Sequence, residues 1–236
     1  DSIQESINCI IKNIKSYETI LKGITLRQEQ IISIRKILYH KRCITQLTTG
    51  AGKTEIMCAV CKLLQIAHNG VMPTVLVLEP TLRLVDDTIS RFKKYDIEIE
   101  KYSDNRKIKE HTVNICHPKS LGNDTEKDTH WLDSVEVLLC DETHHLKSDT
   151  WRKPTSSMRN LVYSVGVSAS AIQQEHTEVT DIRLFTYDEV MMIGATGKLV
   201  LNIKASSMID SGKLAIPILI GLENEADEPM LDSDVT

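Results

Sequence analysis

Apolar side chains recur along the chain at two different spacings, and the switch between them predicts the order of helices and strands. Residues 1–21 carry an isoleucine or leucine at steps of three and four, which predicts an amphipathic helix that Gly23 ends. The same spacing predicts a helix over about 27–40 and two more that end near Leu64 and Tyr95. Short apolar runs between them predict strands: Cys43–Leu47, Val75–Leu78, Ile97–Tyr102, Val113–Cys116, Val135–Cys140 and Tyr163–Val167.

This alternation of strand and helix predicts an α/β fold with a mostly parallel central sheet flanked by helices. A helix between two parallel strands makes a right-handed crossover, which brings the chain back to the same end of the sheet. The run Val135–Cys140 is apolar at almost every position, as expected of a strand that is covered on both faces. In such a fold a ligand site is expected at the carboxyl ends of the strands.

The bulk composition indicates the class of protein to which the chain belongs. With 41% hydrophobic and 26% charged residues the chain is an ordinary globular mixture. It contains no apolar run long enough to span a membrane, and its first residues lack the pattern of a secretory signal, so we expect neither a membrane span nor a signal segment. The net charge is −5, yet six acidic side chains and no Lys or Arg follow Gly221, so the rest of the chain is close to neutral. We expect this acidic tail to be a linker or unstructured.

The six cysteines are scattered through predicted core elements rather than arranged as a disulfide framework. We therefore expect reduced thiols and an intracellular setting, in the cytoplasm or nucleoid, or in a host cell if the source is viral. Cys58 and Cys61 form a Cys-x-x-Cys pair inside a predicted helix. That position favours packing over a metal or redox role.

A glycine-rich turn follows the first predicted strand and opens a helix. Gly50 and Gly52 allow the backbone to curl, so that successive N–H groups face the phosphates of a nucleotide. Lys53 would add a positive charge to the same oxygens, and the Thr54 hydroxyl would bind Mg²⁺. The strict phosphate-loop pattern has Gly where this chain has Leu47. The predicted nucleotide-binding residues of this loop are Thr49, Gly50, Ala51, Gly52, Lys53 and Thr54.

The strand Val135–Cys140 delivers two adjacent carboxylates, Asp141 and Glu142, with His144 close behind. Burying two carboxylates costs several kcal/mol unless a positive charge compensates, and a magnesium nucleotide supplies that charge. Asp141 would hold Mg²⁺ through water, and Glu142 would act as the general base on the attacking water. With Lys53 they are the predicted catalytic residues.

A zinc site is the alternative interpretation of this stretch, since Cys140, His144 and His145 lie close together in sequence. It would require a fourth ligand. On an extended strand, Cys140 would also point away from its neighbour Asp141.

With both motifs in place, the chain resembles the first RecA-like motor domain of the superfamily 2 DExH-box helicases and translocases. Within that superfamily it is most similar to the branch of UvsW-like phage recombination helicases and XPB-type translocases. The resemblance covers about residues 26–220 and implies a P-loop ATPase domain that binds ATP and Mg²⁺. It also implies a nucleic-acid partner, and favours DNA over RNA.

The resemblance assigns roles to further residues. Leu26-Arg27-Gln28-Glu29-Gln30 resembles the element whose glutamine reads adenine, which makes Gln30 and Arg27 candidates for nucleotide binding. Ser168-Ala169-Ser170 resembles the motif that couples hydrolysis to strand movement through the DExH histidine, here His144. Two further segments resemble nucleic-acid contacts, and the candidate residues in them are Thr81, Arg83, Lys119 and Ser120.

We expect three parts in the chain: an amphipathic extension over 1–25, the ATP-binding domain over 26–220 and the acidic tail over 221–236. The family completes its ATP site with arginines from a second RecA-like domain, and the sixteen residues after Ile220 hold no arginine. The fragment is therefore expected to bind ATP and hydrolyse it feebly, with the second domain as its partner.

Two alternatives to a helicase or translocase remain open. The same motor fold also drives restriction and nuclease complexes, although no nuclease constellation of Asp, Glu and Lys is evident in this sequence. The chain could instead be a non-catalytic nucleotide switch or scaffold. The presence of Lys53, Thr54, Asp141 and Glu142 argues against that second alternative.

Overall fold

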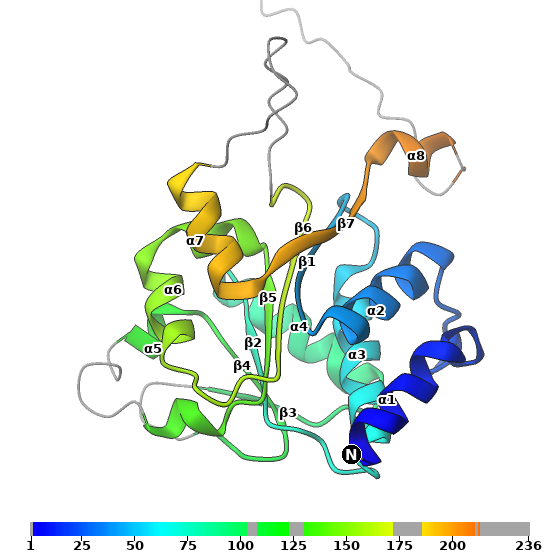
Figure 1. Ribbon diagram of the computed structural model, residues 1–236, viewed down its shortest axis with the longest axis horizontal. Coiled ribbons are helices and arrows are strands. Elements are labelled where there is room, and N and C mark those ends of the chain that lie inside the picture. Colours follow the sequence, from blue (N-terminus) through cyan, green and yellow to red (C-terminus); the bar gives the residue numbers. More distant parts are fainter. Residues whose placement is uncertain (1, 103–107, 123–129, 172–185, 211, 213–236) are drawn as a thin grey trace, which may run out of the picture.

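The computed structural model describes residues 2–102, 108–122, 130–171, 186–210 and 212, and within them the chain forms a seven-stranded parallel sheet (Figure 1). The strand order is β3-β4-β2-β5-β6-β1-β7, and each neighbouring pair runs parallel. This confirms the predicted fold class. The strands are β1 Arg42–Leu47, β2 Val75–Leu78, β3 Ile99–Lys101, β4 Val113–Cys116, β5 Val137–Asp141, β6 Tyr163–Ser168 and β7 Lys198–Ile203.

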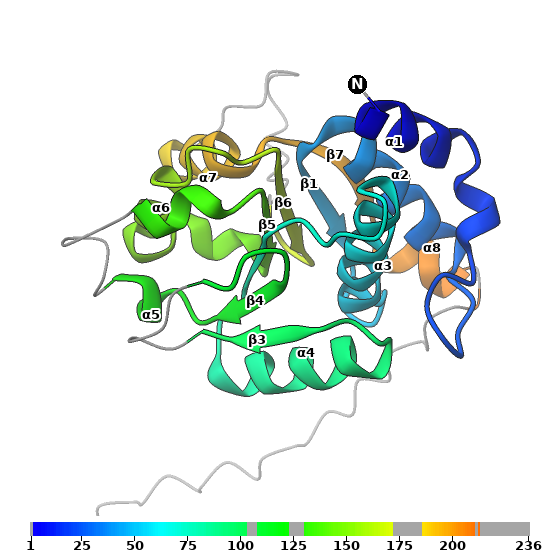
Figure 2. The same cartoon turned by 90° about the horizontal axis from the view of Figure 1, so that it is seen from below.

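Helices cover both faces of the sheet, which Figure 2 shows from below, with α3 and α4 to one side and α6 and α7 to the other. Side chains on each strand alternate between the two faces. Val75 and Val77 of β2 join the core with α1 to α4, whereas Leu76 and Leu78 join the core with α5 to α7. The helices are α1 Ser2–Lys12, α2 Gln28–His40, α3 Lys53–Ala67, α4 Leu82–Lys94, α5 Lys119–Gly122, α6 Asp149–Ser156, α7 Tyr187–Thr196 and α8 Ala205–Asp210, with short 3₁₀ helices η1 Ile14–Tyr17, η2 His130–Ser134 and η3 Thr143–Lys147.

The prediction of one helix over residues 1–21 is wrong in its second half. Helix α1 ends at Lys12, and the chain turns through η1. The Asn13 side chain donates to the carbonyl of Cys9 at 3.1 Å, and such local side-chain bonds compete with helix continuation. Leu21 is nevertheless buried, in the same core as residues of α1. The division at residue 26 stays a prediction.

The sequence pattern also missed α7 and β7. A capping box at Thr186 and Glu189 starts α7, in which each side chain bonds the other residue's backbone N–H. After Gly197, β7 pairs with β1 and extends the sheet at its edge. The predicted acidic tail, and most of the segment 171–192 to which no role is assigned from the sequence, lie outside the described residues.

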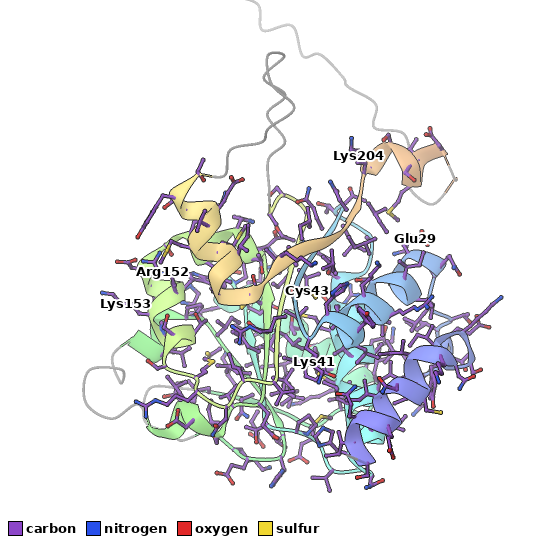
Figure 3. The ribbon with its side chains drawn as sticks, viewed as in Figure 1. Glu29, Lys41, Cys43, Arg152, Lys153 and Lys204 are labelled. Atoms are coloured by element: carbon purple, nitrogen blue, oxygen red, sulfur yellow. The ribbon has the colours of Figure 1, made fainter. Side chains whose placement is uncertain are left out.

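All six cysteines are free thiols, and only Cys9 is exposed. Cys43 lies on β1 in the middle of the molecule (Figure 3). Burial raises the pKa of Cys43 and of Cys61 to about 12, which keeps both thiols protonated and unreactive. The Cys-x-x-Cys pair packs inside α3, as predicted. Within the described ranges, no helix has the length and apolar character to cross a bilayer.

Candidate nucleotide-binding site

The predicted nucleotide motifs meet at the carboxyl edge of three neighbouring strands, at the upper end of β1 and β6 in Figure 1. The phosphate loop follows β1, and the acidic motif follows β5. Strand β6 lies between β1 and β5 in the sheet and ends at Ser168. The sheet order therefore places Ser168 between the loop and the two carboxylates.

The phosphate loop depends on two glycines in the left-handed region of backbone space. Gly50 has a φ of 81° and Gly52 a φ of 78°, values that L side chains rarely adopt. A Cβ on Gly52 would also lie 2.3 Å from Nε2 of Gln30. Leu47, which stands where the strict pattern has glycine, is the last residue of β1 and is fully buried in the core. Leu47 thus extends the strand by one residue and fills the core.

Arg27 and Gln30 hold this loop from the start of α2. The Gln30 side-chain amide donates to the carbonyls of Ala51 and Gly52 at 3.1 and 3.3 Å. Its oxygen accepts from the backbone N–H of Arg27, and the Arg27 guanidinium donates to the Gly50 carbonyl at 3.0 Å. Both polar ends of Gln30 are therefore occupied within the protein. The role of Gln30 in reading adenine stays a prediction.

Lys53, the first residue of α3, lies between the two carboxylates of the acidic motif. Its Nζ donates to Oε1 of Glu142 and lies 3.7 Å from Oδ1 of Asp141. Glu142 adopts a left-handed backbone conformation with a φ of 46°, and its N–H donates to Oδ1 of Asp141 at 2.9 Å. This turn places the two adjacent carboxylates on the same ammonium group. Residues that are 88 and 89 positions apart in sequence thus form one cluster.

Burial and the charge of Lys53 shift the pKa values of these two carboxyls in opposite directions. Burial raises the pKa of Asp141, and the attraction of Lys53 only partly offsets it. Burial alone would also raise the pKa of Glu142, but the hydrogen bond and charge of Lys53 outweigh it and lower the pKa, with help from Ser168. The site therefore keeps Glu142 ionised, as a general base requires.

The predicted coupling residues form a hydrogen-bonded chain behind Glu142. The Ser168 hydroxyl donates to Oε2 of Glu142 at 3.0 Å and accepts from the backbone N–H of Ser170 at 3.2 Å. His144 Nδ1 lies 3.1 Å from the same hydroxyl oxygen. Because the hydroxyl proton goes to Glu142, this geometry requires a proton on Nδ1 of His144. Burial and neighbouring His145 lower the pKa of His144, which favours the neutral ring.

A third carboxyl, which the sequence reasoning did not single out, lies beside this cluster. Glu79 directly follows β2, and the register of β2 with β5 aligns it with Asp141 on the α3 and α4 face. Glu79 is fully buried, and its Oε1 accepts from the Thr88 hydroxyl of α4 at 2.8 Å. Burial, followed by repulsion from Asp141, raises the pKa of Glu79 to about 8. A carboxylate directly after an apolar strand, the signal that identified Asp141, is present here as well.

The raised pKa of Glu79 predicts a pH dependence of stability in the absence of metal and nucleotide. Between the ordinary pKa of 4.5 and the folded value of about 8, the folded chain holds a proton that the unfolded chain releases. Stability from this proton is present below pH 4.5 and is lost as the pH rises toward 8. Glu79→Gln carries no such proton. Its free energy of unfolding should therefore match wild type near pH 5 and exceed it by about 2–4 kcal/mol near pH 8.

Urea denaturation of both chains at the two pH values measures this difference. Asp141, Lys53 and Glu142, which act electrostatically on Glu79, are present in both chains, so the two chains differ only at Glu79. Equal pH dependence in the two chains would contradict the raised pKa.

A cavity of about 930 Å³ opens next to the phosphate loop and offers room for a nucleoside. Arg27 and Gln30 line one wall of this cavity. A network that the sequence reasoning missed lines another wall, in which exposed Arg91 donates to Oε1 of buried Glu55 and the Tyr95 hydroxyl lies 3.4 Å from the same oxygen. These residues come from α3, the last turn of α4 and the residue that follows it, so only the packing of the two helices brings them together.

The candidate nucleic-acid residues follow the next two strands along the same edge, β2 and β4. Thr81 caps α4 by accepting from the backbone N–H of Leu84 at 3.2 Å, and the Arg83 side chain is 91% exposed. Lys119 and Ser120 start α5 after β4, the strand that neighbours β2. The structure thus places all four at the starts of α4 and α5, which follow neighbouring strands, and their contact with a nucleic acid stays a prediction.

The residues present fit a magnesium nucleotide better than a metal ion held by protein ligands alone. Among the described residues, no three His, Cys, Asp or Glu side chains converge to hold an ion by themselves. Cys140 packs in the core with α5 to α7, on the face of β5 opposite Asp141. The backbone cradle at Gly50 and Gly52 has no room for a side chain at Gly52, and two carboxyls face it. Phosphate oxygens would complete the set of ligands.

A parallel sheet with a glycine-rich phosphate loop and an acidic strand end on neighbouring elements defines a RecA-like P-loop domain of the helicase and translocase class. The sequence matches the family described as type III restriction enzyme, res subunit, over residues 23–172, and the chain belongs to this family. No curated protein matches the chain significantly.

Solved structures agree with this fold. A crystal structure of the UvsW helicase from bacteriophage T4 matches with a TM-score of 0.60 and 17% identity, covering 82% of this chain and 67% of that one. The Hef helicase domain of Pyrococcus furiosus matches with a TM-score of 0.56 and 18% identity, covering 75% of this chain and 37% of that one. The Sulfolobus solfataricus SWI2/SNF2 ATPase core in complex with dsDNA matches with a TM-score of 0.51 and 16% identity, covering 64% of this chain and 33% of that one. These matches confirm the predicted RecA-like fold, and the chain spans about a third of each of the last two.

Proposed function

We propose that this chain is the ATP-binding motor domain of an ATP-dependent helicase or translocase that moves on nucleic acid, with DNA favoured. The observation that supports this most directly is the cluster in which Lys53 of the phosphate loop meets Asp141 and Glu142. An ammonium group and two carboxylates at a backbone cradle fit the charges of a magnesium triphosphate. The family match and the helicase fold support the same function.

In the proposed mechanism Lys53 changes partners. Without nucleotide it is bound to Glu142, so the phosphate oxygens of ATP compete with that carboxylate for the ammonium group. Once displaced, Glu142 is free to accept a proton from the attacking water, while the Ser168 hydroxyl keeps its other oxygen oriented. Thr54 and Asp141 would hold Mg²⁺, which neutralises charge on the phosphates when it is bound.

The hydrogen-bonded chain from Glu142 through Ser168 to His144 would couple ATP hydrolysis to movement of the nucleic acid. A change in the position of Glu142 alters the hydrogen bond that the Ser168 hydroxyl donates, and His144 bonds the same oxygen. The side chains of the neighbouring loops would contact phosphates of the strand. A second RecA-like domain would contribute arginines and close over the nucleotide. The proposed strand contacts are Thr81, Arg83, Lys119 and Ser120.

A second candidate is the motor of a restriction complex, in which translocation feeds a nuclease. The description of the matching family, a subunit of type III restriction enzymes, favours it. The site chemistry is the same in both cases. The two candidates therefore differ only in what the motor is attached to.

Glu142→Gln tests the proposed chemistry, because it removes the base and preserves the shape of the side chain. In a protein that contains this chain and its second domain, we expect ATP hydrolysis stimulated by DNA to fall by about a hundredfold or more. Binding of Mg-ATP should remain or become tighter, because a neutral amide in place of the carboxylate no longer competes as an anion for Lys53. Hydrolysis at the wild-type rate would rule out the proposed role of Glu142, and wild-type protein that shows no nucleic-acid-stimulated hydrolysis would rule out the motor function.

A further inference from the structure

Among the described residues, Glu79 is the buried carboxyl at this edge of the sheet whose chemistry the proposed mechanism leaves unused. Its side chain is fully buried, and its Oε2 has no hydrogen-bond partner within the part of the chain that the structure describes. The Oε1 atom is anchored by the Thr88 hydroxyl at 2.8 Å. A buried carboxyl with one oxygen unpaired is costly, so it calls for a reason beyond packing.

The pairing of β2 with β5 places Glu79 next to the charged side chains of the site. β2 and β5 are paired so that Leu78 stands opposite Cys140, which puts Glu79 and Asp141 side by side on the same face of the sheet. Asp141, Lys53 and Glu142 all act electrostatically on Glu79. Glu79 thus belongs to the same cluster as the phosphate-loop lysine, although it comes from the strand on the far side of β5.

The charges of this cluster do not balance within the protein. One ammonium group, that of Lys53, serves the two carboxyls of Asp141 and Glu142 and faces that of Glu79 as well. No other Lys or Arg of the described ranges forms an ion pair with any of the three carboxyls. A divalent cation that arrives with a nucleotide supplies the missing positive charge.

We propose that Glu79 is a further positioning residue of the magnesium–nucleotide site, which holds the ion together with Asp141 through water. Contact through water follows from the absence of three converging ligands among the described side chains. Mg²⁺ retains several waters when it is bound by few carboxylates and by phosphates, and such waters need acceptors. The unpaired Oε2 provides one. This inference rests on the proposed nucleotide-binding function.

Glu79 then makes nucleotide binding more dependent on Mg²⁺. At a pH above the raised pKa of about 8, Glu79 is ionised without the ion, and a third carboxylate beside Lys53 repels the phosphates. With the ion it attracts the metal. Glu79→Gln removes both effects and retains an oxygen that can accept from Thr88. The variant should therefore bind nucleotide tighter than wild type without metal, and it should need about tenfold more Mg²⁺ for half-maximal tightening.

A titration of the 236-residue chain with fluorescent ADP above pH 8, in EDTA and at increasing Mg²⁺, measures both effects without hydrolysis. Thr88→Val is the matched control, because it removes the anchor of Glu79 on α4 and keeps the carboxylate. A purely structural role of Glu79 predicts that both variants weaken binding equally with and without metal. The proposed role predicts that the ratio of the two affinities changes in Glu79→Gln and stays within about twofold in Thr88→Val.

The outcomes separate this inference from the function on which it rests. If wild type does not bind nucleotide, both are overturned. If wild type binds with Mg²⁺ dependence and Glu79→Gln shows the same dependence, only the role of Glu79 is overturned. Failure of Glu79→Gln to fold would also overturn it, because the charge would then serve the fold.

Discussion

Replacing Lys53 with alanine is expected to weaken binding of Mg-ATP to this chain by about a hundredfold. Among the described residues, its ammonium group is the only Lys or Arg charge that pairs with Asp141 and Glu142, and the phosphate loop offers phosphates no other side-chain cation. A charge-assisted hydrogen bond contributes about 1.5–3 kcal/mol. Its loss, with two carboxylates left to repel the phosphates, accounts for a change of this size.

Isothermal titration of the folded chain with a non-hydrolysable ATP analogue and Mg²⁺ measures this effect. Lys62→Ala is the matched control, because Lys62 lies on the same helix α3, outside the phosphate loop, and carries the same charge. In a full-length protein, Lys53→Ala should also abolish activity that depends on nucleotide. Wild-type affinity in Lys53→Ala would refute the phosphate-loop assignment.

A methyl group added at Gly166 is expected to destabilise the chain by about 2–3 kcal/mol, as overpacking of a closed core does. A Cβ at this position of β6 would lie 2.1 Å from Oγ1 and 2.8 Å from Cγ2 of Thr143. Thr143 is fully buried, and its hydroxyl is 3.3 Å from the carbonyl of Cys140, so its side chain cannot swing into solvent. Because Thr143 directly follows Glu142, the strain should reach the acidic motif and weaken nucleotide binding as well.

Urea denaturation of Gly166→Ala against wild type measures this loss. Gly194→Ala provides the control: Gly194 is exposed on helix α7, with no atom within 4 Å of an added Cβ. In that helix, alanine in place of glycine should stabilise the folded chain by about 0.5–1 kcal/mol. Combining Gly166→Ala with Thr143→Ala should restore part of the stability, since two of the three close contacts disappear. A stable Gly166→Ala chain with normal nucleotide binding would contradict the close packing of β6 against η3.

The strands buried on both faces were the most predictable part of the fold. Val75–Leu78 and Val113–Cys116 form strands with the predicted bounds, because continuous apolar runs between polar turns fit a covered parallel strand. The strand β7 at the sheet edge was not predicted, since it is only half-buried and follows a segment without a clear pattern. Residues 1–21 kept helical spacing although the helix stops at Lys12, because the 3₁₀ turn after it buries Ile14 in nearly the same register.

The phosphate loop and the acidic motif were predictable because their chemistry is local. Each consists of neighbouring residues at the end of an apolar strand, and parallel strands bring such ends to one edge. Contacts that depend on register were not predictable. The alignment of Glu79 with Asp141 requires the pairing of β2 with β5, and the Glu55–Arg91 network requires the packing of α3 against α4. The hydrogen bonds that Gln30 donates to the loop carbonyls likewise depend on how α2 packs against the loop in the folded chain.

The most direct test of the account is a crystal structure of this chain with Mg²⁺ and a non-hydrolysable ATP analogue. We predict phosphates on the backbone N–H groups of residues 50–54, with Lys53 released from Glu142 and bound to phosphate oxygens. The ion should lie between Thr54 and the side of the cleft formed by Asp141 and Glu79. A nucleotide bound elsewhere on the molecule, with the Lys53–Glu142 contact intact, would contradict the account.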